Sequence, residues 1–408
     1  MLNALWIGFF VTAFGAAVLQ FLGGDAAIFG VVMKAAFEAA GTAFEVALGL
    51  TGVMCLWLGV MKVGERAGFL DLLGRALAPL FARLFPEVPK GHPALGSITM
   101  NMAANVMGLD NAATPMGLKA MRELQSLNPS PDTASDAQIL FLVLNASSVT
   151  LLPVTIFTYR AQMGAQDPSD VFIPILMATY CSTLAGFLFI SVVQRIRLDG
   201  VVLAWMVGIT ALVGALAGYF AQLPAARMTL QSSALSNFLL LLLVLVFLLG
   251  AAWKRVNAYE AFIDGAKEGF QVAVGIIPYL VAMLVGIGML RASGALPAFV
   301  ETVRGGVQAL GFDAAWVDGL PTMLMKPLSG SGARAMMVET MRASGADSFA
   351  GRLSSIVQGS TETTFYVLAV YFGAVGIKRV RHAVAGGLIA DLAGFTAAVA
   401  VTYLFFAG

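Results

Sequence analysis

Apolar runs long enough to cross a lipid bilayer recur along the whole chain, and they constrain its fold more than any other feature. A transmembrane helix needs about 20 predominantly apolar residues. The charged fraction is 12%, whereas soluble domains carry about 25% charged residues. The sequence therefore predicts an all-α polytopic membrane protein without a soluble domain of any size. We expect nine transmembrane helices, at residues 1–22, 44–63, 138–160, 171–193, 200–221, 237–252, 270–290, 350–372 and 383–406.

Four further stretches are helical in pattern but are not simple membrane spans. Residues 95–127 and 320–343 are too polar and too often interrupted to cross directly, so we expect two re-entrant helical hairpins there. Residues 65–85 and 292–311 alternate apolar and charged side chains at helical spacing. That alternation is typical of amphipathic helices that lie in the membrane interface.

The basic residues indicate the orientation in the membrane. Cytoplasmic loops carry an excess of Lys and Arg, and most of the basic residues share one side if the loop holding Arg195 and Arg197 is cytoplasmic. Residues 1–22 lack the basic start of a cleavable signal peptide, so we expect a retained first helix. The sequence predicts a multi-pass protein of the cell inner (cytoplasmic) membrane, with the N-terminus inside and the C-terminus outside.

Two halves of the chain resemble each other. "FEVALG" at 44–49 matches "FQVAVG" at 270–275, and "TLAGF" at 183–187 matches "DLAGF" at 391–395. We divide the chain into a first repeat (1–198), connecting transmembrane helices (199–253) and a second repeat (254–408). Five expected crossings separate the starts of the two repeats, and an odd number inverts the second copy. Inverted repeats with interrupted segments at matching positions are typical of secondary transporters.

The first predicted hairpin contains candidate substrate-binding residues. Asn101 and Asn105 lie four apart, on one face of a helix. The helix is then interrupted around Asp110, Asn111 and Thr114, and Asp or Asn there suits the start of the second half-helix. The main chain at such a turn cannot face lipid, because unpaired N–H and C=O groups there are costly.

The second predicted hairpin has a different chemistry. Its turn reads "SGSG", with Ser329 and Ser331 as candidate substrate-binding residues, and Arg334 adds positive charge. Successive N–H groups in a Gly/Ser turn that opens a helix form an anion-binding concavity. A small carboxylate, a phosphate or a polar ring edge would suit these donors, and a closed structural turn is the alternative.

The spans that follow the two hairpins carry polar breaks at matching positions. The first break, "NASSVTLLP", offers Asn145 and Ser148. The second, "QGSTETT", offers the candidate substrate-binding residues Gln358, Ser360, Glu362 and Thr363. An ionisable side chain in an apolar span is costly and is a functional candidate by default.

A coupling ion, Na⁺ or H⁺, is the remaining requirement of a secondary transporter. We assign Asp110 and Glu362 as the residues for that ion. A structural ion pair with Arg334 or Arg352 is the alternative role for Glu362.

These motifs resemble a known family. "NMAANVMGLDNAATPMGLKAMREL" at 101–124 resembles spore maturation protein A, and "GRLSSIVQGSTETTFYVLAVYFGAVGIKRVRHA" at 351–383 resembles spore maturation protein B. The chain looks like a fusion of the two. Both are nucleoside-recognition, or Gate domain, membrane proteins, distantly similar to concentrative nucleoside transporters. The resemblance implies inverted re-entrant hairpins and cation-coupled uptake, and it leaves the substrate open.

We therefore expect a cation-coupled secondary transporter of a small polar or anionic metabolite, such as an amino acid or an organic acid. A nucleoside transporter and a non-transporting membrane scaffold of an envelope complex are the alternatives. The sequence has neither an HExxH nor a GxSxG motif, so no enzyme and no catalytic residues are expected. Cys55 and Cys181 are isolated, which predicts no metal site, and no cofactor is expected. We expect a homo-oligomer in the bilayer, and the net charge of +1 favours no nucleic-acid partner.

Overall fold

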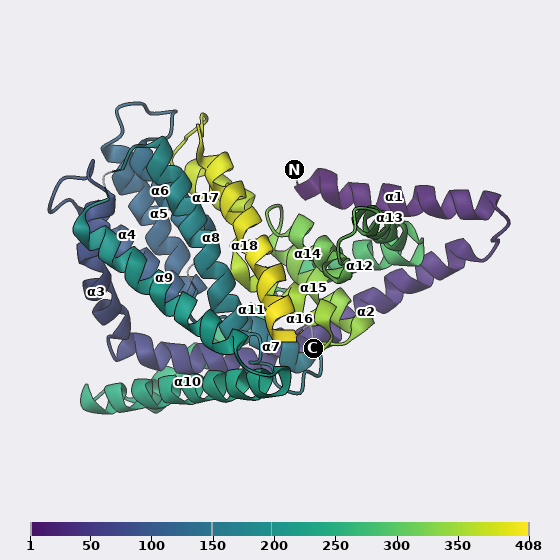
Figure 1. Cartoon of the computed structure of the whole chain (residues 1–408), viewed down its shortest axis with the longest axis horizontal. Coiled ribbons are helices and arrows are strands. Elements are labelled where there is room, and N and C mark those ends of the chain that lie inside the picture. The colour runs from purple at the N-terminus through teal and green to yellow at the C-terminus, as the bar shows by residue number, and fades with distance from the viewer. Residues whose placement is uncertain (1, 148–149, 197, 407–408) are drawn as a thin grey trace. The chain divides into compact units, whose positions relative to one another are not determined.

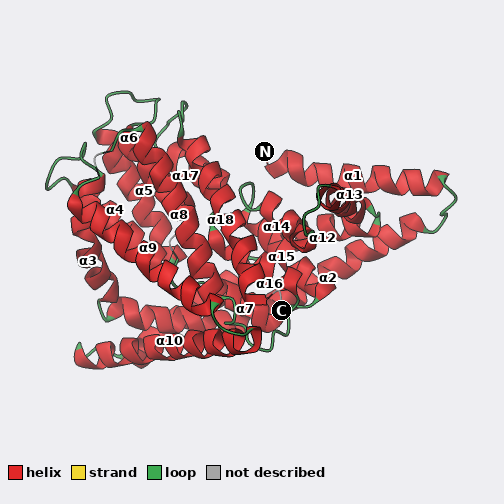
Figure 2. Cartoon of the chain, in the orientation of Figure 1, coloured by secondary structure: helices red, strands yellow, loops and turns green. Residues whose placement is uncertain are grey.

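The computed structural model of the chain describes residues 2–147, 150–196 and 198–406. Within these ranges, the side chains that are not described are those of Leu2, Asp110, Asn111, Ala112, Ala225, Ala226 and Thr229. The described residues are mainly helical and contain no strand (Figure 2). One isolated β-bridge joins Thr133 and Arg379. The predicted all-α fold is confirmed.

The helices follow one another along the chain, as labelled in Figure 1. In order they are α1 (Leu2–Leu22), α2 (Ile28–Arg66), α3 (Phe69–Leu84), α4 (Pro93–Val106), α5 (Asp110–Ser126), α6 (Asp136–Ser147), α7 (Val154–Gln162), α8 (Phe172–Val193), α9 (Gly200–Ala221), α10 (Ala225–Trp253), α11 (Ala258–Gly275), α12 (Ile277–Ala292), α13 (Ala295–Ala309), the 3₁₀ helix η1 (Ala315–Gly319), α14 (Leu320–Met325), α15 (Gly330–Ser344), α16 (Phe349–Ser360), α17 (Thr364–Gly373) and α18 (Ala383–Phe406).

Seven helices in the described part of the chain are long and apolar enough to cross a membrane. They are Asn3–Leu22, Ile28–Arg66, Phe172–Val193, Gly200–Ala221, Leu230–Trp253, Ala383–Phe406 and Ala258–Ala292, the last of which comprises α11 and α12 counted together. The chain is a polytopic membrane protein, as predicted. The two other predicted spans, 138–160 and 350–372, are each divided between two shorter helices, α6 with α7 and α16 with α17.

The second membrane helix is longer than predicted. We expected a span at 44–63, and α2 covers Ile28–Arg66. Its added N-terminal part is rich in apolar residues and in alanine, which is the best helix former. It also contains an ion pair between Lys34 and Glu38, 3.7 Å apart and one helical turn apart.

The chain is folded into two compact units. The first comprises Met1–Leu58, Thr155–Pro168 and Ala266–Gln358, and the second comprises Gly59–Val154, Ser169–Gly265 and Gly359–Gly408. Each unit thus combines segments of both predicted repeats. The chain passes between the units next to the interruptions that separate α6 from α7 and α16 from α17. Each interrupted span therefore contributes helical segments to both units.

The second unit is organised around α8 and α18, which lie side by side (Figure 1). Glycines make this packing close. An added Cβ at Gly186 would lie 3.0 Å from Cβ of Ala390, and one at Gly386 would lie 2.9 Å from Cδ1 of Ile190. Small residues let membrane helices approach each other in this way. Helices α6 and α17 pack against this pair, and their apolar side chains share one buried core with those of α8.

The first unit is built on α12, which packs against α1 and α15. Trp6 of α1 donates from Nε1 to the carbonyl oxygen of Ala282 over 2.9 Å. Gln20 donates from Nε2 to the carbonyl oxygen of Ser293 over 2.6 Å. The short helix α14 and α15 lie where the second hairpin is predicted, and they pack against each other.

Candidate functional site

Three interruptions of helices meet in the second unit. They are the turn between α4 and α5, the end of α6, and the break between α16 and α17. The main-chain amide of Glu362 donates to the carbonyl oxygen of Ala146 over 2.8 Å, which joins the α16–α17 break to the end of α6. The amide of Leu151 donates to the carbonyl oxygen of Val106 over 2.9 Å, which joins the segment after α6 to the first hairpin.

The local sequence explains where α7 begins and how the first hairpin turns. Pro153 lacks an N–H donor and disfavours helix in the residue before it, and α7 begins at Val154. The hairpin turn contains Gly108, whose φ of 70° is in the left-handed region that glycine adopts readily. An added Cβ at Gly108 would lie 2.6 Å from the carbonyl oxygen of Leu152. The two interruptions therefore touch, and only glycine allows the approach.

Amide side chains form a network between the hairpin and α6. Asn105 donates from Nδ2 to Oδ1 of Asn145 over 2.8 Å, and Asn145 donates to the carbonyl oxygen of Phe141 over 2.9 Å. Asn101 is fully buried and donates from Nδ2 to the carbonyl oxygen of Ala113 over 2.7 Å. The predicted site residues Asn101, Asn105 and Asn145 are thus brought together, and much of their bonding capacity is used within the protein.

Tyr371 of α17 completes this network, and sequence reasoning did not assign it to the site. Its hydroxyl donates to Oδ1 of Asn145 over 3.3 Å, and its ring stacks on Phe141 with centroids 5.8 Å apart. The available signal was the repeat, because Tyr371 aligns with Tyr159 in the other half of the chain.

The α16–α17 break carries the predicted residues Ser360, Glu362 and Thr363. Glu362 is half-buried, whereas Ser360 and Thr363 are buried. The carboxylate of Glu362 accepts a hydrogen bond from the amide of Thr363 over 3.3 Å. Oγ1 of Thr363 is buried without a hydrogen-bond partner among the described residues. This break therefore presents a carboxylate and polar oxygen atoms in the interior of the unit.

The second hairpin lies in the first unit, where its turn bonds to itself. Oγ of Ser329 accepts from the amide of Gly332 over 3.0 Å and lies 3.2 Å from Oγ of Ser331. Arg334 donates from Nε to the carbonyl oxygen of Gly330 over 3.2 Å. One of the donors expected to bind an anion is thus occupied by the N-cap side chain. Gln358, at the end of this unit, is 8% exposed, and its Oε1 has no partner in the described chain.

Three predicted site residues lie outside the description. Ser148 is not among the described residues, and the side chains of Asp110 and Asn111 are not described, although α5 begins at Asp110. Thr114 is half-buried in the second turn of α5. Among the described residues, no group of three His, Cys, Asp or Glu side chains could hold a metal ion.

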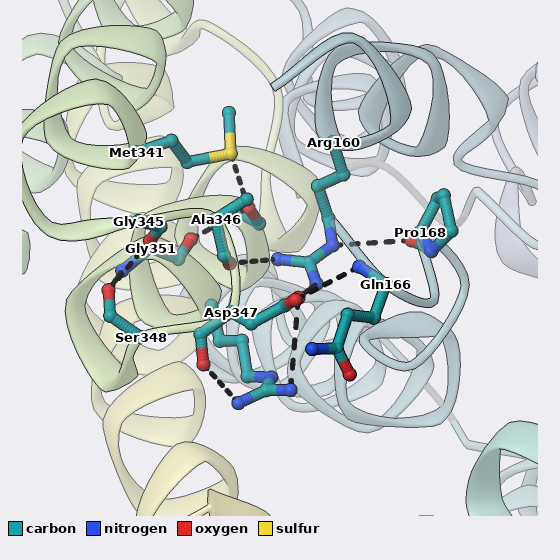
Figure 3. A network of polar contacts seen from close by, with 11 residues as sticks. Arg160, Gln166, Pro168, Met341, Gly345, Ala346, Asp347, Ser348 and Gly351 are labelled. Carbon is teal, nitrogen blue, oxygen red and sulfur yellow. Dashed lines mark hydrogen bonds and ion pairs between the residues drawn. The ribbon is translucent and has the colours of Figure 1, made fainter. Parts of the chain in front are cut away.

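A buried arginine that sequence reasoning did not assign to the site ties together part of the first unit (Figure 3). Arg160 of α7 is fully buried and donates to the carbonyl oxygens of Ala346 and Pro168 over 2.7 and 3.3 Å. It also pairs with Oδ1 of Asp347 at 3.1 Å. The other oxygen of Asp347 accepts from the amide of Gln166 over 2.9 Å. The network fixes the turn between α15 and α16 against α7.

Comparison with known proteins now identifies the family. The Gate family, described as nucleoside recognition, matches residues 47–163 and 273–378, which together are more than half of the chain. The chain belongs to the Gate family. One matched segment of this Gate protein lies in each predicted repeat. No solved structure matches the chain.

Two relatives from Bacillus subtilis (strain 168) extend this result. The Gate protein is 36% identical over 188 residues to spore maturation protein A, a match that covers 46% of this chain and 93% of the relative. It is 44% identical over 172 residues to spore maturation protein B, which covers 42% of this chain and 95% of the relative. The predicted resemblance to both proteins is confirmed.

Proposed function

We propose that this Gate protein is a cation-coupled secondary transporter of a small polar or anionic metabolite, such as an amino acid or organic acid. The meeting of three interrupted segments in the second unit carries the proposal. Inside a bilayer, irregular main chain is tolerated only where it is buried in protein or lines a water-filled cavity. Interrupted helices in inverted repeats are how secondary transporters build their binding sites.

Glu362 is the residue to which we assign the coupling ion, together with Asp110. Its carboxylate lies at the break, and its amide bonds to the end of α6. An ion or ligand bound there would act on the α16–α17 break and on α6 together. The amide network of Asn101, Asn105 and Asn145 would position the hairpin beside that break.

A nucleoside is the second candidate substrate. An apolar pocket of about 190 Å³ in the second unit is lined by Phe81, Phe187 and Trp205, with Asn105 among the few polar side chains. Aromatic walls with few polar groups are the usual environment of a bound planar ring. The description of the family as nucleoside recognition agrees with this candidate.

Reconstituted uptake tests the proposal. The purified protein in liposomes is given an imposed Na⁺ or H⁺ gradient and labelled amino acids, organic acids or nucleosides, one class at a time. We expect saturable accumulation of one class that requires one gradient. Conductance without saturation would indicate a channel. Absence of uptake and of ligand-induced thermal stabilisation in every class would overturn the proposal in favour of a membrane scaffold.

A variant at the break sharpens the test. Glu362→Gln removes the charge with little change in shape, and we expect gradient-driven accumulation to fall at least about tenfold, since ionisable groups in membrane spans carry coupling. Glu260→Gln, at an exposed position in the first turn of α11, is the matched control and should transport normally. Normal accumulation by Glu362→Gln would remove this residue from the mechanism.

The membrane and the assembly are part of the same proposal. We place the protein in the inner membrane with its N-terminus inside and its C-terminus outside, as the distribution of basic residues favours. We also propose a homo-oligomer. Protease protection of tags at the two termini, and the mass of the purified complex in detergent, test these two points separately.

A further inference from the structure

Helix α18 carries a buried carboxylate that the sequence-based site does not include. Asp391 is 2% exposed, in the middle of a helix that is apolar and long enough to cross a membrane. Its Oδ2 accepts a hydrogen bond from Oγ1 of Thr364 over 2.7 Å, at the first residue of α17. An ionisable side chain in such a helix is costly to bury, and it usually marks an ion or substrate pathway.

Three hydroxyl-bearing residues lie beside Gly394, one turn further along α18 from Asp391. An added Cβ at Gly394 would lie 2.7 Å from Cγ2 of Thr361, 3.1 Å from Cβ of Ser182 and 3.3 Å from Oγ of Ser360. Asp391 and Gly394 are three residues apart in α18 and lie on neighbouring turns of one face. Thr361 lies in the α16–α17 break, three residues before Thr364. Because Gly394 has no side chain, three hydroxyl-bearing residues from α8 and the α16–α17 break can pack against α18 one turn from Asp391.

Two of these hydroxyls are buried without satisfying their hydrogen-bonding capacity. Oγ of Ser182 and Oγ1 of Thr361 have no hydrogen-bond partner among the described residues. Elsewhere in the chain, helical hydroxyls donate to the carbonyl oxygen one turn earlier, as Thr402 does to Ala398 over 2.6 Å. A buried hydroxyl without a partner costs about 1–3 kcal/mol. These two oxygen atoms are thus available to a ligand.

The main chain adds favourable charge for a cation. Helix α16 ends at Ser360, beside this cluster. The last carbonyl groups of a helix lack intrahelical donors and carry a partial negative charge. Ends of interrupted helices coordinate Na⁺ or H⁺ in secondary transporters. Carboxylate, hydroxyl and carbonyl oxygens together are the ligand set of a hard cation.

We propose that Asp391, Thr364, Thr361 and Ser182 form a Na⁺ site between α8, the α16–α17 break and α18. This inference adds a Na⁺ site whose ligands do not include Asp110 or Glu362, and in giving that Na⁺ a part in transport it rests on the proposed function. Na⁺ accounts for the cluster better than a proton does. A proton on Asp391 would neutralise that carboxyl group alone, whereas a cation also uses the oxygen atoms of Ser182 and Thr361.

Na⁺ binding to the full-length protein in detergent tests the site without any substrate. Thermal stability and binding of radiolabelled Na⁺ are measured in NaCl, KCl or choline chloride at constant ionic strength. We expect stabilisation by Na⁺ only, and no stabilisation or saturable binding in Asp391→Asn. Ser182→Ala and Thr361→Val should each raise the apparent Kd for Na⁺ about tenfold, because a ligand to a charged group contributes at least this much.

Ser191, on the same helix as Ser182, provides a matched control. Ser191 of α8 is also buried, and its hydroxyl has no partner among the described residues, but it lies about 13 Å further along the helix. Ser191→Ala should leave the Kd unchanged. If Asp391→Asn does not fold, the Ser182→Ala and Thr361→Val variants decide. An unchanged Kd in both, or no Na⁺ effect on the wild type, would overturn the site.

The uptake assay separates this inference from the proposed function. Suppose that Na⁺ stabilises the wild type but not Asp391→Asn, and that no uptake is found. This result would support the site and count against transport. Saturable uptake by a protein that shows no Na⁺ binding would support transport and overturn the site. Uptake that depends on Na⁺, and that requires a higher Na⁺ concentration for half-saturation in Thr361→Val, would support both the site and transport.

Discussion

Asn105 donates a hydrogen bond from Nδ2 to Oδ1 of Asn145 over 2.8 Å, and this bond joins the first hairpin to α6. We predict that Asn145→Ala lowers the free energy of unfolding by about 1–3 kcal/mol, because it leaves the amide of Asn105 without this acceptor. Asn105→Ala should cost less, since Asn105 is half-buried.

The double variant tells whether the two side chains act as a pair. Residues that share a hydrogen bond show coupling of about 0.5–3 kcal/mol in a double-mutant cycle. Chemical unfolding in detergent micelles gives all four free energies. Strictly additive effects would mean that the bond between Asn105 and Asn145 contributes nothing to stability.

Gly117 of α5 is required by the packing of α17. An added Cβ there would collide with the hydroxyl of Tyr371 and lie 2.9 Å from Nδ2 of Asn101. We predict that Gly117→Ala destabilises the protein by about 1–3 kcal/mol, the usual cost of overpacking. Thermal unfolding measures it. Gly96→Ala, at an exposed position of α4 with open space around the new Cβ, should instead stabilise by about 0.5–1 kcal/mol.

Arg160 is the buried cation that fixes the turn before α16. Arg160→Met leaves Asp347 without this cation and the carbonyl of Ala346 without this donor, and we predict a loss of about 3 kcal/mol in unfolding free energy. Asp347 is partly exposed and also approaches Arg352, which limits the loss.

The exposed pair of α2 provides the control for this prediction. Lys34→Met breaks the Lys34–Glu38 pair, in which both side chains are more than half exposed, and should change stability by less than about 0.5 kcal/mol. Equal effects of Arg160→Met and Lys34→Met would show that burial does not strengthen the Arg160 network.

His382, just before α18, is the residue from which we predict a pH dependence of stability. Burial lowers its pKa from the ordinary value of 6.5, and the charge of Arg381 lowers it further, whereas Asp136 acts in the opposite direction. Gln194 donates from Nε2 to the carbonyl oxygen of Asp136, and the same Nε2 lies 3.0 Å from Nε2 of His382. His382 Nε2 is thus an acceptor, which is the neutral form of the ring.

The sign of the pH effect follows from that lowered pKa. The contribution of His382 to stability is complete above pH 6.5 and is lost as pH falls below it through the lower pKa of the folded state. We predict that, as pH is lowered through 6.5, the free energy of unfolding of the wild type falls more steeply than that of His382→Gln. Denaturant titrations at several pH values measure both slopes. Parallel profiles would mean that protonation of His382 does not act on the fold.

Local sequence patterns predicted the membrane helices and two of their interruptions. The long apolar runs predicted the membrane helices, and the motifs around Asn145 and Glu362 predicted where two spans are interrupted. The effects of proline, glycine and helical spacing on the main chain extend over only a few residues. They can therefore be predicted from the sequence alone. The motifs at 101–124 and 351–383 also indicated the family.

Contacts between distant segments were decided only by the tertiary structure. The hydrogen bonds from Tyr371 to Asn145 and from Thr364 to Asp391 join residues that are distant in sequence, and no local pattern predicts them. Each compact unit also contains segments of both sequence repeats. By itself, the sequence determined the helices and their interruptions, because these depend on near neighbours. The buried polar networks depend on which helices pack together, because a buried amide, hydroxyl or carboxylate must find its partner wherever the fold places one.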